Sequence, residues 1–249
     1  MPFTFSHPAL LFPFKYLPRS WVSITGLVTG SIAPDFEYII NGTRTFSHTL
    51  KGAVWLDLPV AIIIALIFHN FVREKLVAHL PKFLYKRFAG LKNIRWNLYF
   101  KKHSPIVIVS VLFGIGTHLL WDSFTHGTGY FVIRLPVLQQ NVAVEGIRMP
   151  MQALVWFLSS IAGAIVIIIF VYFLPKKYST SKKSIAWFWI KFILIMALIS
   201  AFLFSRIKNA DTDWDAVGMV FLRSALLSVV LTAAFSKRDN KNYTNNQLV

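Results

Sequence analysis

The segment 105-PIVIVSVLFGIGTHLLWDSFTHGTGY-130 decides the fold class, because it begins as an apolar helix and ends in glycines, hydroxyls and ionisable side chains. Residues 105–121 are long and apolar enough to cross about 30 Å of hydrocarbon. His118, Asp122 and His126 then follow one another at intervals of four residues. The segment predicts a membrane-spanning helix with a polar cluster at one end.

The rest of the chain has the composition of an integral membrane protein. Of its 249 residues, 55% are hydrophobic and 14% are charged, which lies outside the range of soluble domains. Further spanning stretches are expected at 53–71, 153–174, 185–205 and 217–235. Residues 21–33 are too short and too rich in Gly, Ser and Thr to span, so we expect a half-buried helix that ends at Pro34. The sequence therefore predicts an all-α polytopic membrane protein with about five spanning helices and a short N-terminal half-helix.

The charge distribution predicts the orientation of these helices. Lys and Arg concentrate in 72–104 and 175–184 and in the tail, and they are sparse in 122–152. The positive-inside rule puts the basic segments in the cytoplasm and the 122–152 loop, together with residues 1–52, on the extracytoplasmic face. The net charge of +16 then reflects topology and contact with anionic membrane lipids, and we expect no nucleic-acid partner.

The chain has no internal repeat and is expected to form one α-helical membrane domain, residues 1–235, followed by a polar tail, 236–249. Segment 72–104 alternates basic and aromatic residues, so we expect one or two cytoplasmic interfacial helices with breaks at Pro81 and Gly90. The first twenty residues lack the basic and continuous apolar regions of a cleavable signal. We therefore expect insertion through the first spanning helix.

The predicted topology gathers several ionisable residues at one membrane depth. His118, Asp122 and His126 share one face of a helix if that helix persists to Gly127. Ionisable groups inside a bilayer are costly and usually mark a functional site. No cysteine occurs in the chain, so His, Asp and Glu are the available metal ligands.

Three further motifs on the same side of the membrane carry polar residues. They are 3-FTFSHPA-9 with His7, 30-GSIAPDFEY-38 with Asp35, and 43-TRTFSHTLKG-52 with His48. Each motif alone is explained by a helix cap or a turn. Their combination with the 118–126 cluster favours a shared site.

These motifs resemble those of a known family. The set FTFSHP, G-x3-PD, SHTLKG and G-x-x-H-x3-D-x3-H resembles a bacterial membrane-protein family, the domain of unknown function DUF4184, over most of the chain. The stretches 44-RTFSH-48 and 116-GTHLLWDSFTHGTG-129 resemble the YdjM-type inner-membrane metal-dependent hydrolases. The order of His and Asp residues is also distantly similar to the zinc-dependent phospholipase C family, which binds three zinc ions in an all-α fold.

The resemblance implies a divalent metal, zinc or alternatively Mn or Fe, and a ligand set of His7, Asp35, His48, His118, Asp122 and His126. With such a metal, a carboxylate, Asp122 or Asp35, would orient a metal-activated water, and His126 would protonate the leaving group. The H-x3-E ligand pair of the phospholipases is missing after residue 126, where Glu145 is the one substitute, so we expect one or two metals instead of three.

The favoured function is hydrolysis of a lipid-like or membrane-associated ester or phosphodiester at the outer face of the bacterial inner membrane. One alternative is an ion or proton carrier that uses the His/Asp cluster with Lys191 and Arg223, and another is a structural metal site without catalysis. Arg44, Arg134 and Arg148 could hold a phosphate, but we interpret them as headgroup contacts. The sequence carries no indication of oligomeric state.

Overall fold

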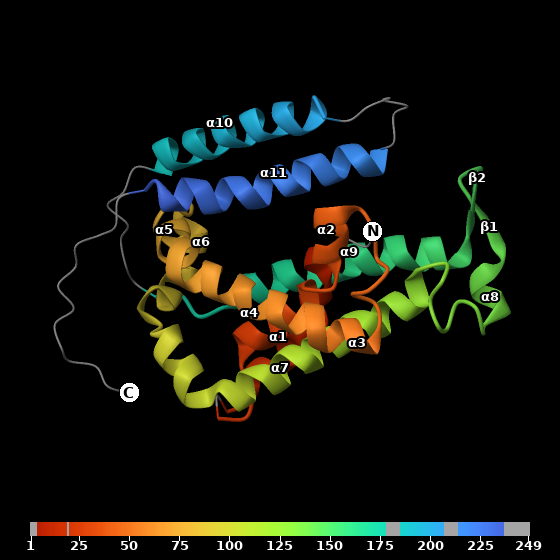
Figure 1. Ribbon diagram of the computed structural model, residues 1–249, viewed down its shortest axis with the longest axis horizontal. Helices are drawn as coiled ribbons and strands as arrows, with labels where there is room; N and C mark the ends of the chain where they lie inside the picture. The colour runs from red at the N-terminus through yellow and green to blue at the C-terminus, as the bar shows by residue number, and fades with distance from the viewer. Residues whose placement is uncertain (1–3, 19, 178–184, 207–213, 237–249) are drawn as a thin grey trace. The chain divides into compact units, whose positions relative to one another are not determined.

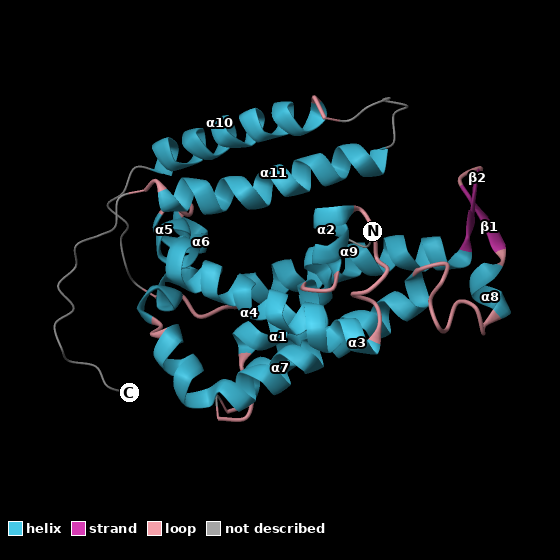
Figure 2. Ribbon diagram, viewed as in Figure 1, coloured by secondary structure: helices cyan, strands magenta, loops and turns pink. Residues whose placement is uncertain are grey.

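Most of the described chain is helical. The structure, a computed structural model, describes residues 4–18, 20–177, 185–206 and 214–236. Among these residues one short hairpin supplies all of the strand structure (Figure 2). Five helices are long and apolar enough to cross a membrane: Leu50–Ala78, Trp96–Thr125, Met151–Tyr172, Ile185–Phe204 and Ala216–Ala234. The predicted all-α polytopic fold with five spanning helices is confirmed.

The chain divides into two compact units, one of residues 1–69 and 93–177 and the other of residues 70–92 and 178–249. The single membrane domain expected over 1–235 stays a prediction. The predicted polar tail, apart from Ser236, lies outside the described residues.

The first unit holds the N-terminal elements, red to orange in Figure 1, and the predicted polar cluster. Its elements are the 3₁₀ segment η1 (Thr4–Tyr16), α1 (Ile24–Ile32), α2 (Asp35–Asn41), α3 (Leu50–Gly52), the π-helical turn η2 (Ala53–Asp57), α4 (Leu58–Ile67), α7 (Trp96–Thr125), α8 (Pro136–Gln139), β1 (Asn141–Val144), β2 (Ile147–Pro150) and α9 (Met151–Tyr172). The second unit contains α5 (Arg73–Ala78), α6 (Lys82–Phe88), α10 (Ile185–Phe204) and α11 (Trp214–Ala234). The short segments η3 (Phe68–Val72) and η4 (Ala89–Asn93) contain residues of both units.

The half-helix expected over 21–33 is α1, and its ends follow from local chemistry. Ser23 precedes the helix in an extended conformation, and its hydroxyl accepts a hydrogen bond from the backbone N–H of Gly26 at 3.2 Å. At the other end α1 stops before Pro34, which lacks a backbone N–H to continue the ladder. Asp35 then becomes the first residue of α2.

Glycines let α1 and α7 approach backbone to backbone. A Cβ on Gly26 would lie 2.8 Å from a backbone oxygen of α7, and a Cβ on Gly114 would overlap a backbone oxygen of α1. Such contacts between small residues are a common way to join helices in membranes. The close approach brings the end of α1, at Ser31, against His118, one turn beyond Gly114.

The N-terminal segment η1 packs against α9. A Cβ on Gly163 of α9 would lie only 2.7 Å from the Cβ of Ser6, so η1 depends on a glycine at this position. The rings of Phe12 and Phe170 stack with centroids 3.7 Å apart. The segment η1 also contacts α7, and its residue His7 is buried.

Two local features differ from the sequence-based expectation. Segment 72–104 does contain helices α5 and α6, with a break at Pro81, but residues 96–104 already belong to α7. A non-helical residue, His103 (φ −127°, ψ 30°), lies two positions before Pro105, whose missing N–H and ring interrupt the helical hydrogen bonds there. The segment between α7 and α9 contains the β1–β2 hairpin, whose turn residues Glu145 and Gly146 have positive φ.

The second unit packs α10 against α11, with α5 beside α11. The ammonium group of Lys75 donates to the backbone oxygen of Ala233 at 2.7 Å. His79 stacks on Phe188 at 4.5 Å, and its backbone oxygen accepts a hydrogen bond from the indole of Trp189. These polar and aromatic contacts join its helices.

Candidate metal centre

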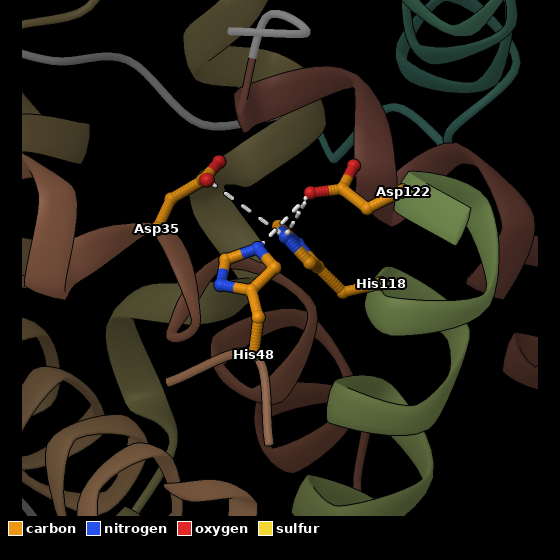
Figure 3. Close-up of side chains that lie close together, drawn as sticks. All are labelled: Asp35, His48, His118 and Asp122. Carbon is orange, nitrogen blue, oxygen red and sulfur yellow. Dashed lines mark hydrogen bonds and ion pairs between the residues drawn. The ribbon is translucent and has the colours of Figure 1, made fainter. Parts of the chain in front are cut away.

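Four side chains from three parts of the first unit converge on one point (Figure 3). His118 and Asp122 come from α7, Asp35 from the start of α2, and His48 from the loop before α3. One donor atom of each lies within 4.8 Å of the donor atoms of the other three. Ligand atoms arranged tetrahedrally at about 2.0–2.2 Å from zinc are roughly 3.4 Å apart, so the group is somewhat wider than a filled zinc site but compact enough to hold a divalent metal.

Asp122 lies at the centre of this group. Its Oδ2 is 3.1 Å from Nε2 of His48 and 3.3 Å from Nε2 of His118. Nε2 of His118 is in turn 3.8 Å from Oδ1 of Asp35. His118 and Asp122 meet because positions four apart lie on one side of a helix.

The backbone fixes the tautomer of His118. Its Nδ1 lies 2.7 Å from the carbonyl oxygen of Ser31, and because a carbonyl only accepts, Nδ1 carries the proton. The lone pair of Nε2 therefore faces the two carboxylates. Nε2 of His118 and the Oδ1 atoms of Asp35 and Asp122 are buried and have no hydrogen-bond partner among the described residues. Buried polar atoms rarely stay unpaired, and a cation at this point would satisfy Nε2 of His118 and Oδ1 of Asp35, which lie 3.8 Å apart.

Hydroxyl groups support two of the donors. The hydroxyl of Thr4 donates to Oδ2 of Asp35 at 2.6 Å, which orients that carboxylate. Oγ of Ser47 lies 2.9 Å from Nδ1 of His48 and is able to accept a hydrogen bond from it. Accepting it leaves Nε2 of His48 free as a ligand atom, the arrangement common around metal-binding imidazoles.

His7 joins the cluster from η1. Its ring stacks on that of His118, with centroids 3.9 Å apart, and its Nε2 lies 3.6 Å from Oδ1 of Asp122. Burial, together with the neighbouring imidazole of His118, holds the pKa of His7 well below its ordinary value. His7 is therefore neutral at pH 7, the form that coordinates a metal. It lies outside the group of four, and its role as a ligand stays a prediction.

His126 lies at the edge of the cluster. The last helical residue of α7 is Thr125, and His126 has an extended backbone (φ −106°, ψ 141°). Its Nδ1 is 3.5 Å from Oδ2 of Asp122, whereas its Nε2 accepts a hydrogen bond from Nη1 of Arg44. Burial lowers the pKa of His126, the charge of Asp122 opposes this, and the charge of Arg44 adds to it. Because the helix stops before Gly127, the three-residue face expected from the sequence is incomplete.

Glu37 holds the loop that carries Arg44 and His48. Its carboxylate accepts hydrogen bonds from the hydroxyl or backbone N–H groups of three consecutive loop residues, Thr45, Phe46 and Ser47. The shortest of them, from the N–H of Ser47, is 2.7 Å. Partial burial raises the pKa of Glu37, but these hydrogen bonds outweigh it and leave the pKa below its ordinary value. Glu37 is thus ionised at neutral pH and fixes the loop.

Three side chains of the cluster are partly exposed. The side chains of Arg44, His48 and His126 are 18%, 21% and 24% exposed, whereas that of Asp122 is 4% exposed. The cluster therefore has a partly exposed edge formed by these three side chains, and Asp122 lies behind it.

The structure brings together all six side chains that the resemblance implied as ligands: His7, Asp35, His48, His118, Asp122 and His126. Two contributions were not expected. Arg44 was interpreted as a headgroup contact, although the RTFSH motif places it four residues before His48. Glu37 had no signal in the sequence, because its role depends on the fold of the following loop.

Two other acidic residues lie outside the group of four. Glu145 is exposed in the turn of the β1–β2 hairpin. Asp57 is buried in η2, and its oxygens have no hydrogen-bond partner among the described residues. It interacts electrostatically with His118, Glu37 and Asp35.

Comparison with known proteins agrees with the motifs. The family model described as domain of unknown function (DUF4184) matches residues 1–236, so the chain belongs to this family. No curated protein and no solved structure matches the chain.

Proposed function

We propose that this DUF4184 protein is a membrane-embedded, metal-dependent hydrolase of a lipid-like or membrane-associated ester or phosphodiester. The observation that carries the proposal is the convergence of Asp35, His48, His118 and Asp122 on one point. The motif similarity to YdjM-type hydrolases, and the distant similarity to zinc-dependent phospholipases C, supports the same chemistry. We place the site on the extracytoplasmic side of the bacterial inner membrane, because the basic segment 72–104 would face the cytoplasm.

The donor set fits zinc best, with Mn or Fe as alternatives. Two imidazoles and two carboxylates are ligands that these metals accept in proteins. Catalytic zinc sites keep a position open, and the partial exposure of His48 agrees with such a position. When bound, the cation would polarise the scissile group and lower the pKa of a bound water to about 7.

The side chains of the cluster would divide the remaining work. Asp122, with oxygens directed at several donors, would orient the water. His126 at the open edge is placed to take up a proton and deliver it to the leaving group. The apolar helices around the cluster would exclude bulk water, which strengthens electrostatic interactions there.

Metal analysis in mild detergent tests the proposal. We expect at least one Zn, Mn or Fe per chain in the unmodified protein, and loss of metal and of esterase or phosphodiesterase activity in His118→Ala and Asp122→Asn. His103→Ala, a histidine of the same helix outside the cluster, should keep both. The proposal is wrong if the unmodified protein holds no stoichiometric metal, or if the metal content is unchanged in the His118 and Asp122 variants.

The two alternatives give different outcomes in the same variants. An ion or proton carrier would lose uptake into liposomes, although Lys191 and Arg223, its expected helpers, belong to the other unit. If the metal site is structural, the variants should have a lower melting temperature, and neither they nor the unmodified protein should show turnover.

A further inference from the structure

Arg44 approaches the metal-binding atoms without being bonded to them. Its Nη2 lies 3.9 Å from Oδ1 of Asp35, and its Nη1 lies 4.0 Å from Oδ2 of Asp122. Both distances exceed the roughly 3.2 Å of a hydrogen bond. Among the described residues, its one hydrogen-bonding partner is His126. Most of the five N–H donors of the guanidinium group are therefore available to a ligand.

The guanidinium group is held in place from two directions. It lies over the ring of Tyr38, with 4.7 Å between its central carbon and the ring centroid. Glu37 also fixes the loop that carries Arg44, because it accepts a hydrogen bond from Thr45, the next residue. Arg44 is thus preorganised, which lowers the entropic cost of binding a ligand.

The charges of the cluster favour an anionic ligand. Its permanent charges are the carboxylates of Asp35 and Asp122 and the guanidinium of Arg44. One divalent cation would offset the two carboxylates nearest to it, which leaves the guanidinium charge of Arg44 available to an anionic ligand. A metal cation beside a guanidinium group attracts anions, and the planar fork of arginine matches the oxygens of a phosphate. A neutral carboxylic ester presents no charge for the guanidinium to balance.

We propose that Arg44 and the metal centre together bind a phosphoryl group, so that the substrate is an anionic phosphate ester and not a carboxylic ester. This inference rests on the proposed function and names its substrate class. The phosphoryl group would enter past the exposed edges of Arg44, His48 and His126, where its free oxygens meet the available N–H donors. Hydrolysis would add one water, break one P–O ester bond and transfer a proton from the water to the departing alcohol.

Binding of inorganic phosphate to the metal-loaded protein, measured by titration calorimetry in detergent, tests this assignment. Loss of a charge-assisted pair of hydrogen bonds should weaken phosphate binding by about 10- to 100-fold in Arg44→Gln. Arg44→Lys keeps the charge without the fork and should give an intermediate loss. Metal content, measured on the same samples, should not fall in either variant, because Arg44 supplies no ligand atom.

The matched control is Arg134→Gln. Arg134 belongs to the same unit and also lies over a tyrosine, Tyr130, at 3.6 Å, but it has no contact with the cluster. Its substitution should leave phosphate binding unchanged. Acetate, which carries charge without a phosphoryl group, should bind weakly to all variants.

Each outcome separates this inference from the proposed function. Metal bound without phosphate binding, or equal phosphate affinity in the unmodified protein and Arg44→Gln, overturns the inference alone. A counter-charge role for Arg44 gives tighter metal binding in Arg44→Gln with unchanged phosphate affinity, which also overturns it. Absence of metal from the unmodified protein overturns the proposed function as well.

Phosphate binding in membranes of different lipid composition distinguishes a lipid headgroup from a water-soluble phosphate ester as the source of the phosphoryl group. In nanodiscs, phosphatidic acid in place of phosphatidylcholine should weaken the apparent binding of inorganic phosphate if lipid headgroups enter the site. Unchanged phosphate binding points to a water-soluble phosphate ester. Either result keeps the assignment, provided that the effect of Arg44→Gln on phosphate binding is present.

Discussion

Substitution of Glu37 by Gln should weaken metal binding although Glu37 touches no metal-binding atom. Its carboxylate accepts hydrogen bonds from three consecutive loop residues, Thr45, Phe46 and Ser47. A hydrogen bond to a charged acceptor contributes about 1.5–3 kcal/mol, and partial exposure of Glu37 reduces this. Gln keeps one acceptor oxygen and turns an amide N–H₂ toward the remaining donors. We expect a net cost of about 1–2 kcal/mol in holding the loop.

This cost appears in metal affinity because the same loop positions His48, one of the four donors. A loss of 1–2 kcal/mol corresponds to a factor of about 5–30 in affinity. Competition with a coloured chelator at pH 7 measures it. Glu145→Gln changes an exposed carboxylate in the hairpin turn of the same unit and should have no effect. Affinities within twofold of each other for Glu37→Gln and the unmodified protein would refute the reasoning.

The pH dependence gives a second check on Glu37. Because its folded pKa lies below the ordinary value, its contribution is present above the unfolded pKa of about 4.3 and is lost as pH falls through the folded pKa. The carboxylate is thus ionised throughout the range in which histidines bind metal. The ratio of affinities between the unmodified protein and Glu37→Gln should therefore stay constant between about pH 5.5 and 8. A ratio that falls toward one within this range would contradict the assigned role.

Three further predictions concern packing and the cluster. Gly114→Val should destabilise the protein by about 3 kcal/mol, because its Cβ would overlap a backbone oxygen of α1. Gly116→Ala is the control, because a Cβ there meets open space and should not change the stability. Melting temperatures of the two variants in detergent test this difference. Thr4→Val removes the hydroxyl that donates to Asp35 and should lower metal affinity about 10-fold in the chelator titration, and equal affinity would exclude this role. Removal of the metal by a chelator should lower the melting temperature reversibly. The stability lost is about 2.7 kcal/mol when the metal concentration was 100 Kd. The melting temperature of Asp122→Asn should not change when the chelator is added.

The sequence was sufficient for features that depend on local spacing. Hydropathy alone locates five spanning helices, because about 20 consecutive apolar residues are what a bilayer requires. The four-residue interval likewise places His118 and Asp122 on one face of α7. The end of that helix was not predictable from the interval. It depends on the turn after Thr125, where the N–H of Gly129 bonds to the backbone oxygen of His126.

Only the tertiary structure decided how the separate motifs meet. The hydrogen bond between His118 and Ser31 joins positions 87 residues apart, and it requires the backbone contact of α1 with Gly114 of α7. Arg44 reaches the carboxylates because Glu37 folds the intervening loop back on itself. Local sequence patterns thus specify the membrane class, the helices and the chemical types of the candidate ligands. Their common centre and its arginine depend on contacts between distant segments, which no local pattern encodes.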